Sequence, residues 1–381
     1  MKKFLTLITT VFLCSIQCFM IIVRADGPGS ISSHSAILYE PQSGRALFEK
    51  DAHTKRPMAS TTKIMTALLA VEKCPPDMVV TVTDEAVRVE GSALGLRGGD
   101  KITMIDLVTG LLLESGNDAA NVIAYTVSGS IKAFADLMNK RAAEIGMKNT
   151  VFVTPSGLDQ GEHSSTAWDM ALLAAECLNN EIIASICEKK SAVIKFGNPP
   201  RNIRVSNHNR LLQLYPHAIG MKTGFTKKSG RCLVSAAQKD GVRLIGVTLK
   251  AGDDWNDHIA MYEYGFSITK LVSLPVPKLP PVQVTGGLNS HISPTVKIPP
   301  QRVMLKSEEK NLRVDVALPH FVFAPVCAGD VIGNVRYSVG DSEILRLDIT
   351  ASQNVKALPP PGFIKRFGRK FTMLFTEWLK L

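Results

Sequence analysis

The strongest constraint in this sequence is a long apolar stretch that follows a short polar start. Residues 58–72 read Met-Ala-Ser-Thr-Thr-Lys-Ile-Met-Thr-Ala-Leu-Leu-Ala-Val-Glu, and after the first turn nearly every position is apolar. A helix that is apolar on all sides is stable in water only when other elements surround it. We therefore expect a buried helix over residues 58–72 at the centre of a domain.

The stretches around this helix predict an α+β domain over residues 26–273. Strand-like residues flank turns twice, at 35–50 and at 231–250. Helical patterns cover residues 105–113, 118–128, 131–145 and 166–178, and one more is expected over 255–269. Strands at both ends with helices between them favour one antiparallel sheet flanked by a helical cluster.

The rest of the chain predicts a second domain of a different kind. Residues 274–281 read Leu-Pro-Val-Pro-Lys-Leu-Pro-Pro, which is the composition of a stiff linker. From 282 to 357, short alternating runs are separated by glycine and proline turns. This pattern predicts a small all-β, sandwich-like domain, and we find no catalytic grouping of residues in it.

Both ends of the chain carry membrane-related signals. A basic start, an apolar run over residues 4–23 and small residues before Asp26 predict a signal peptide over residues 1–25. The length of the run leaves an uncleaved anchor as the alternative. Residues 363–381 place phenylalanines and Trp378 on one helical stripe beside four cations, which is typical of an amphipathic helix on a membrane surface. Docking of that helix on the protein's own core is the alternative.

The positive charge is concentrated at these two ends. The formal net charge is +10, of which +3 lies in residues 1–25 and +4 in residues 363–381, so the body between them carries +3. Nucleic-acid binding therefore has little support. An exported protein at the outer face of the cytoplasmic membrane or in the cell wall fits both ends better.

The cysteines do not indicate a metal site or a disulfide framework. Five remain after residue 25, odd in number and scattered, with no closely spaced pair. We expect buried free thiols.

Ser60 and Lys63 supply the first candidate for chemistry, at the start of the apolar helix. Residues three apart share a helix face, so the two side chains can meet. A serine hydroxyl needs a base to become a good nucleophile, and burial lowers the pKa of a lysine towards neutrality. The pair is chemically sensible, but this spacing alone is common.

Two further motifs strengthen it. Ser115-Gly116-Asn117 lies between two expected helices and offers a hydroxyl for proton transfer and an amide for a peptide carbonyl. Lys222-Thr223-Gly224 opens a strand; its first two residues can bind a carboxylate, and the glycine allows close backbone approach. The three motifs, in this order, are the signature of class A β-lactamases and penicillin-binding proteins.

The chain resembles the low-molecular-weight penicillin-binding proteins of the D-alanyl-D-alanine carboxypeptidase family. The likeness runs from residue 30 to 355, and the β-domain and the tail fit the same family. The stretches that carry it are Arg56–Thr66, Ser115–Ala120, Thr154–Asp159, His163–Ala171 and Gly220–Val234. The resemblance implies a serine-type carboxypeptidase of the β-lactamase-like fold, without cofactor or metal. It would trim peptidoglycan stem peptides that end in D-Ala-D-Ala, and β-lactams would acylate it.

The resemblance also implies a role for each motif residue. Ser60 would attack the carbonyl between the two D-alanines, Lys63 would be the general base, and Ser115 would relay the proton to the leaving D-alanine. Asn117 would hold the substrate backbone.

The third motif would bind the end of the substrate. Lys222 and Thr223 would hold the terminal carboxylate, beside Gly224. The backbone N–H groups of Ser60 and Phe225 would form the oxyanion hole. Some members of the family carry histidine where this chain has Phe225. The difference does not affect an oxyanion hole formed by the backbone N–H, but it would affect any role of the side chain.

Other reactive residues have plainer explanations. We expect His163 to be a structural hydrogen-bonding residue, and Asp159 and Asp169 to satisfy loops or helix starts. Asp253, Asp254, Asp257 and His258 could suggest a metal, but they sit at an expected helix start.

Three other functions remain open. A class A β-lactamase would need a water-activating glutamate, and we find no convincing segment for it. A transpeptidase or endopeptidase that cuts cross-links would share all three motifs. A non-catalytic cell-wall sensor is disfavoured by the intact motifs.

Overall fold

The structure, a computed structural model, describes residues 27–359. The expected signal peptide and amphipathic helix lie outside these residues. The chain divides into two compact units, the first ending at Ser267 and the second beginning at Ile268, with the turn at 240–242 grouped with the second.

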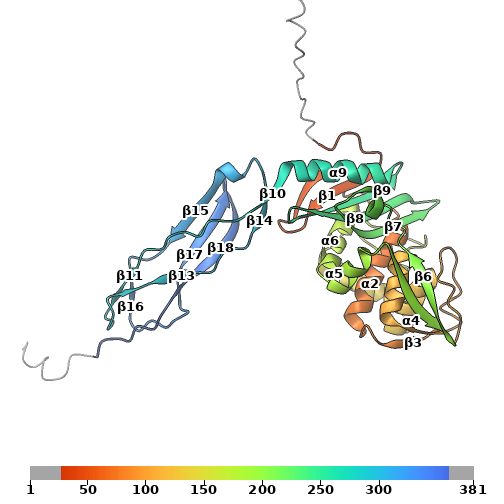
Figure 1. The fold of residues 1–381 in the computed structure, drawn as a ribbon, viewed down its shortest axis with the longest axis horizontal. Coiled ribbons are helices and arrows are strands. Elements are labelled where there is room, and N and C mark those ends of the chain that lie inside the picture. Colours follow the sequence, from red (N-terminus) through yellow and green to blue (C-terminus); the bar gives the residue numbers. More distant parts are fainter. Residues whose placement is uncertain (1–26, 360–381) are drawn as a thin grey trace, which may run out of the picture. The chain divides into compact units, whose positions relative to one another are not determined.

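The first unit is built on a five-stranded antiparallel sheet in the order β2-β1-β9-β8-β7. Its strands are β1 (Ser35–Glu40), β2 (Arg45–Lys50), β7 (Ala218–Thr226), β8 (Gly230–Lys239) and β9 (Val242–Ala251). Both expected hairpins are confirmed, and the N-terminal one joins the later strands through β1, where Ile37 pairs with Val247. Helix α9 (Asp254–Ile268) runs along one face of the sheet (Figure 1).

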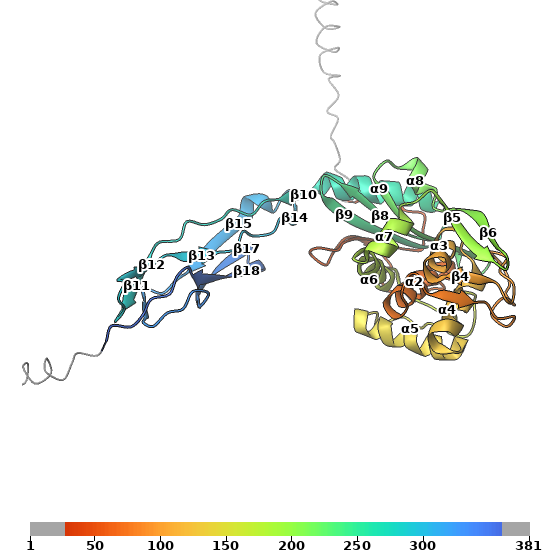
Figure 2. The same ribbon diagram turned by 60° about the horizontal axis from the view of Figure 1, so that its bottom comes forward.

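A cluster of helices packs on the other side of this sheet (Figure 2). It consists of the 3-10 turn η1 (Ala59–Thr62) and α2 (Lys63–Lys73), α3 (Met104–Leu113), α4 (Asn117–Ser128), α5 (Ile131–Ile145), α6 (Ala167–Leu178) and α7 (Glu181–Cys187). The short α8 (Leu211–Leu214) lies beside α9 instead, and Tyr215 directly after it stacks on Tyr262 of α9. Helix α2 is buried at every position from Lys63 to Ala70. The prediction of a buried central helix, with an antiparallel sheet and a helical cluster around it, is confirmed.

Side-chain caps fix where these helices begin. The hydroxyls of Thr103, Ser130 and Thr166 accept a backbone N–H in the first turn of α3, α5 and α6, and Asn180 does the same for α7. Each such bond satisfies a donor that the helix itself leaves unpaired. Between residues 27 and 359 no single helix is long and apolar enough to cross a membrane.

A second, smaller sheet in the first unit was not anticipated from the sequence. Its order is β3-β4-β5-β6, with strands Val79–Thr81, Lys101–Thr103, Ser191–Gly197 and Pro200–Ser206. Two of the strands have only three residues, and they come from distant parts of the chain.

The second unit is all-β, as expected. Its strands are β10 (Thr269–Val272), β11 (Val282–Thr285), β12 (His291–Ile292), β13 (Pro294–Val296), β14 (Arg302–Leu305), β15 (Leu312–Ala317), β16 (Phe321–Phe323), β17 (Val331–Val339) and β18 (Ser342–Ala351), with a 3-10 turn η2 (Glu309–Asn311). They form sheets β10-β14, β12-β11-β16 and β13-β18-β17-β15. Because β10 pairs with β14, the unit already begins ahead of the proline-rich stretch at 274–281.

The expectation of buried cysteines is partly wrong. Cys177, Cys187 and Cys232 are buried free thiols, but Cys74 is half-buried and Cys327 is exposed. Cys327 lies in the loop before β17, where its backbone N–H donates to the Asp330 carboxylate and its carbonyl accepts the Asp330 N–H.

Candidate active site

The junction of η1 and α2 brings Ser60 and Lys63 together. Ser60 lies in the 3-10 turn, and Lys63 is the first residue of α2, with no exposed surface. The Nζ atom of Lys63 lies 2.9 Å from Oγ of Ser60. The preceding residue, Ala59, has a left-handed φ of 48°, a conformation that side chains other than glycine disfavour and that the surrounding packing must hold.

Two fixed acceptors orient the Lys63 amine. Nζ donates to Oδ1 of Asn117 at 2.7 Å and to the backbone carbonyl of Ser156 at 2.6 Å. A neutral amine has two N–H bonds and one lone pair. If these acceptors take both N–H bonds, the lone pair is left for Ser60, whose hydroxyl then donates to it.

The surroundings favour the neutral form of this lysine. Burial lowers the pKa of Lys63 well below its ordinary value, and the charge of Lys222 lowers it further, while Asp118 acts in the opposite direction. Removal from water penalises the ammonium because no surrounding dipoles replace its hydration fully. The arrangement therefore suits a general base.

The second motif stands at the start of α4. Ser115 is 5% exposed and has a left-handed φ of 66°, and Asn117 is the first residue of the helix. The Asp118 carboxylate accepts the backbone N–H groups of Leu94, Gly95 and Leu96. These bonds tie the loop around residue 94 to α4 beside the catalytic groups.

The third motif lies on the edge strand β7. Lys222 is buried, and burial lowers its pKa to about 8. A Cβ atom on Gly224 would come 3.0 Å from the backbone nitrogens of both Ser60 and Thr61. A side chain here would crowd η1, so glycine favours the close approach of β7. The side chain of Phe225 is 66% exposed.

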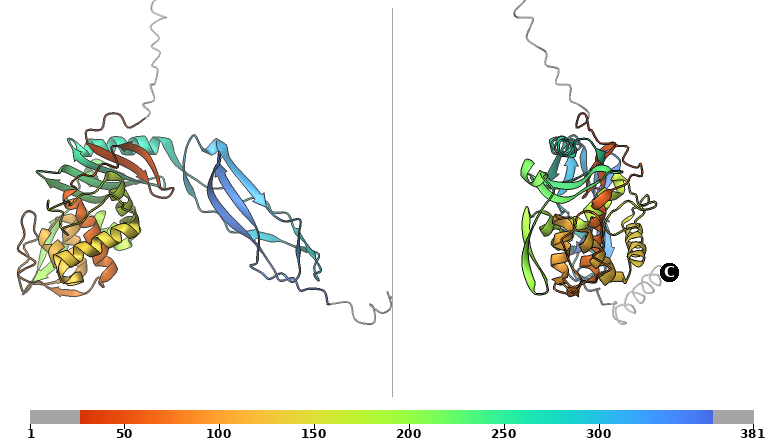
Figure 3. Two further views of the ribbon diagram at one scale, coloured as in Figure 1. Left: turned by 180° about the vertical axis from the view of Figure 1, so that it is seen from behind. Right: turned by 90° about the vertical axis from the view of Figure 1, so that its right-hand side faces the viewer.

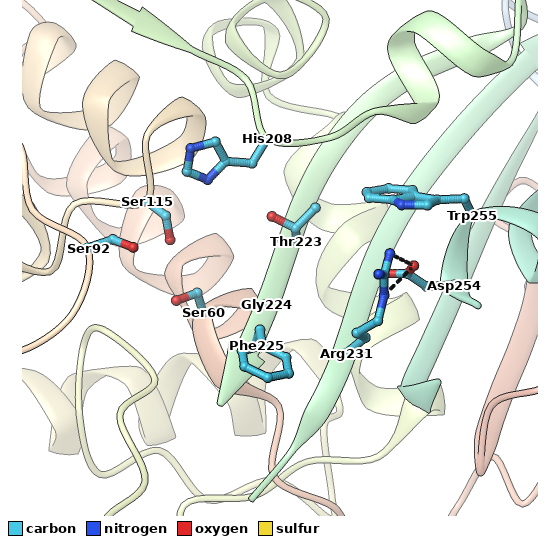
Figure 4. A pocket seen from close by; sticks show the side chains of 10 residues that line it. All are labelled: Ser60, Ser92, Ser115, His208, Thr223, Gly224, Phe225, Arg231, Asp254 and Trp255. Atoms are coloured by element: carbon cyan, nitrogen blue, oxygen red, sulfur yellow. Dashed lines mark hydrogen bonds and ion pairs between the residues drawn. The ribbon is translucent and has the colours of Figure 1, made fainter. Parts of the chain in front are cut away.

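A cavity of about 460 Å³ opens between these elements, within the size range of small-molecule sites. The lining residues are Ser60, Ser92, Ser115, His208, Thr223, Gly224, Phe225, Arg231, Asp254 and Trp255 (Figure 4). Of the eight residues singled out from the sequence, five line the cavity. Lys63 contacts Ser60 directly and Asn117 contacts Lys63, and the Lys222 Nζ atom donates to the Thr223 carbonyl at 2.9 Å.

Arg231 is the main lining residue that the sequence reasoning missed. It lies opposite Phe225 on the neighbouring strand β8. Its guanidinium binds the Asp254 carboxylate, with Nε 2.8 Å from Oδ1, and its Cζ lies 5.5 Å from the centre of the Trp255 ring (Figure 4). A fixed guanidinium in a cavity is a ready partner for a carboxylate. The signal in the sequence was the antiparallel return after the third motif, which brings Arg231 back beside Phe225.

His208 is a second unanticipated lining residue. Its Nε2 lies 3.7 Å from Oε1 of Glu114, the residue before the second motif. Burial and the charge of Lys222 lower the pKa of His208 below its ordinary value.

The other residues weighed from the sequence have structural partners. His163 is buried; its Nδ1 accepts the Val153 N–H at 2.9 Å, so Nε2 carries the proton and donates to Thr62 Oγ1 at 2.8 Å. This agrees with a structural role. Asp169 accepts from Asn149 and Thr150.

The acidic group at the start of α9 is likewise engaged. Asp254 pairs with Arg231, and Asp257 accepts from Ser32 and Ser33. His258 bonds the hydroxyls of two strand residues.

The loop that supplies Ser156 packs directly under the nucleophile. Gly157 has φ of +86°, and a Cβ atom there would lie 1.9 Å from the carbonyl oxygen of Ala59. The loop can approach η1 only with glycine at this position. This contact helps to hold the strained turn that carries Ser60.

Comparison with known proteins places these features in a family. A family model described as D-alanyl-D-alanine carboxypeptidase matches residues 22–253, and one described as the C-terminal domain of penicillin-binding protein 5 matches residues 269–357. D-alanyl-D-alanine carboxypeptidase DacF of Bacillus subtilis is 30% identical, with 87% of this chain and 88% of DacF covered. DacC of Escherichia coli, also named a D-alanyl-D-alanine carboxypeptidase, is 31% identical, with coverage of 92% and 90%. Penicillin-binding protein 5 of Haemophilus influenzae has a similar structure, with a TM-score of 0.69, 26% identity, and coverage of 86% of this chain and 98% of that one.

Proposed function

This chain belongs to the D-alanyl-D-alanine carboxypeptidase family, and we propose that Ser60 is the nucleophile through which it acts. The protein is a serine-type D-Ala-D-Ala carboxypeptidase, a hydrolase of the penicillin-binding proteins that works through an acyl-enzyme. The observation that carries the assignment of Ser60 is the 2.9 Å contact of its Oγ with Lys63 Nζ.

Acylation begins with transfer of a proton from Ser60 to Lys63. The serine oxygen attacks the carbonyl carbon between the two D-alanines, and the Oγ–C bond forms as the carbonyl π electrons move to oxygen. Lys63 is then an ammonium, and its proton passes through the Ser115 hydroxyl to the amide nitrogen of the terminal D-alanine. The C–N bond breaks, D-alanine leaves, and the ester on Ser60 is later cleaved by water.

The developing oxyanion is stabilised by the backbone N–H groups of Ser60 and Phe225. The tight passage of β7 past η1 supports this assignment, because a Cβ atom on Gly224, the residue before Phe225, would lie 3.0 Å from Ser60 N. Donors fixed in advance lower the barrier without rearranging when charge develops. Phe225 acts here through its backbone, in line with its exposed side chain.

The terminal carboxylate is bound by Lys222 and Thr223, and Arg231 adds a second cation on the same side of the cavity. Asn117 holds the peptide backbone. Recognition of a free carboxylate confines cutting to the end of the stem peptide.

β-Lactams bind the same site: Ser60 Oγ attacks the lactam carbonyl, the ring C–N bond breaks, and a penicilloyl ester forms on Ser60. Asp254 is the one carboxylate among the described residues that line the cavity, and it is paired with Arg231. A paired carboxylate is a weak activator of water, which supports slow release of the penicilloyl group and disfavours a β-lactamase.

The ends of the chain direct this activity to the cell wall. We assign residues 1–25 to export, the first unit to catalysis, and the second unit, which includes β10 and the proline-rich stretch 274–281, to a β-sandwich-like module. Residues 363–381 would hold the enzyme on the outer face of the cytoplasmic membrane through their basic, aromatic pattern.

The test is mass spectrometry of a peptidoglycan pentapeptide incubated with the protein lacking residues 1–25. We expect loss of one alanine, abolished by Ser60→Ala, with Ser92→Ala as a matched control because Ser92 also lines the cavity but has no assigned role. Full activity in the Ser60→Ala variant would show that Ser60 is not the nucleophile. Cleavage of a cross-linked dimer but not of the pentapeptide would replace the carboxypeptidase by an endopeptidase.

A further inference from the structure

The sheet β12-β11-β16 presents two aromatic rings to solvent at one end of the second unit. In β16, Val322 packs inwards, while Phe321 and Phe323 point outwards with 48% and 69% of their surface exposed. Their ring centroids lie 5.3 Å apart. The parallel ladder places Phe323 beside Thr285 of β11.

Two exposed leucines lie at the same end of this unit. The Leu358 N–H donates to the Gly286 carbonyl at 2.8 Å, and the Leu288 N–H donates to the Lys356 carbonyl at 2.9 Å. Leu288 is 58% exposed and Leu358 is 54% exposed. These bonds connect both leucines to the turn that follows Thr285.

We call Leu288, Phe321, Phe323 and Leu358 the β11–β16 patch. Figure 1 and the reverse view in Figure 3 show β11 and β16 at the end of the second unit from which the described chain leaves. Exposed aromatic and aliphatic side chains at one end of a domain usually mark a contact surface, because about half or more of each of these side chains remains in water.

The sequence that follows the patch indicates what the patch contacts. Leu358 is followed by Pro-Pro-Pro-Gly and then by the basic, aromatic segment 363–381. Phe363 is five residues beyond Leu358, so covalent geometry keeps the two Cα atoms within about 18 Å whatever the conformation between them. A membrane that holds this segment therefore comes within reach of the patch.

We propose that the β11–β16 patch inserts into the interface of an anionic lipid membrane beside the C-terminal segment. This inference rests on the membrane association given under the proposed function and names a second contact for it. Five cations lie close to Leu358 in the sequence, and their charge suits anionic headgroups. They are the exposed Lys356 and, further along, Lys365, Arg366, Arg369 and Lys370. Pairing with a second copy of the chain would instead bring two such cationic segments together.

The position of the patch is tested by fluorescence quenching. Phe323→Trp is compared with Ile298→Trp in the protein lacking residues 1–25, using vesicles of phosphatidylglycerol and phosphatidylethanolamine with brominated acyl chains. Ile298 is a matched control because it is 83% exposed in the same unit but lies between β13 and β14. We expect vesicles to quench the tryptophan introduced by Phe323→Trp and to leave the one introduced by Ile298→Trp unquenched, over the same background from the three native tryptophans.

The contribution to affinity is tested by vesicle sedimentation. Phe323→Ser with Leu358→Ser should weaken vesicle binding at least tenfold, and Ile298→Ser should not. Acylation by a fluorescent penicillin should be unchanged in these variants, which shows that the catalytic unit is intact.

Four results would overturn the inference. If the unsubstituted protein does not bind vesicles, the membrane association fails and the inference fails with it. If the protein binds but the Phe323→Trp fluorophore is not quenched, only the patch contact is rejected. A blue-shifted emission from Phe323→Trp without vesicles would show that residues 363–381 cover the patch, and a dimer lost on Phe323→Ser would show self-association.

Discussion

Replacing Asn117 by aspartate should move the pH dependence of acylation upwards. Asn117 Oδ1 lies 2.7 Å from Lys63 Nζ, and both residues are buried. Two unit charges within 4 Å interact by about 4 kcal/mol at an effective dielectric constant of 20, which corresponds to a rise of about 3 units in the pKa of Lys63. Negative charge stabilises the ammonium, so the neutral base would form only at higher pH.

The assay is the second-order rate constant for acylation by a fluorescent penicillin, measured across pH. Asn117→Ala is the matched control, since it removes the same bond without adding a charge. Its rate should be lower at every pH, with the acid limb less displaced. At neutral pH, Asn117→Asp should be slower than Asn117→Ala by up to ~1000-fold, because each pKa unit changes the neutral fraction tenfold.

The comparison of the two variants tests whether Lys63 is the base and whether the added charge raises its pKa. Equal acid limbs in the aspartate and alanine proteins, with both folded by circular dichroism, would mean that Lys63 is not the titrating base. An acid limb moved to lower pH in Asn117→Asp would refute the electrostatic argument itself.

Three further predictions follow from other contacts. Gly157→Ala should lower the free energy of unfolding in urea by about 3 kcal/mol, because its methyl group would clash with Ala59. Gly161→Ala is the control, since Gly161 also has a positive φ but open space around it, and it should lower that free energy by about 1 kcal/mol. Equal losses in the two variants would contradict the clash. Burial lowers the pKa of His258 to about 3. The contribution of His258 to the free energy of unfolding is therefore complete above pH 6.5 and declines by about 1.4 kcal/mol per pH unit as the pH falls below that. Unfolding of His258→Gln should depend less steeply on pH in this range, and an unchanged slope would contradict the prediction. Arg231→Ala should raise KM for the pentapeptide about 10- to 100-fold, which corresponds to the loss of one charged hydrogen bond. Arg231→Lys should restore part of the affinity. An unchanged KM would show that Arg231 does not bind the substrate.

The parts of the fold that could be predicted depend on local pattern. The helix over 58–72 was recognisable because an all-apolar helix has one stable location, and the observed α2 is buried along most of its length. The hairpins β1-β2 and β8-β9 carry their own turns. The sheet β3-β4-β5-β6 escaped because strands of three residues have too little periodicity to detect, and their partners lie far along the chain.

The candidate site divides in the same way. The motif residues could be singled out because each motif is contiguous and chemically specific. Ser156 was missed because it contributes a backbone carbonyl, which any residue type would supply. Arg231 and Asp254 were missed as a pair because they meet only when β8 and the start of α9 are placed side by side.

The order of the central sheet has a consequence for how the protein is made. Strand β1 is synthesised first but pairs with β9, with Ile37 and Val247 separated by 210 positions. Because we assign residues 1–25 to export, the sheet can close only after residues 35–251 have crossed the membrane. Until then β1 has only its hairpin with β2, and an isolated hairpin is marginally stable. The emerging chain thus exposes a strand of mostly apolar residues until β9 arrives, and the catalytic unit is open to aggregation during that interval.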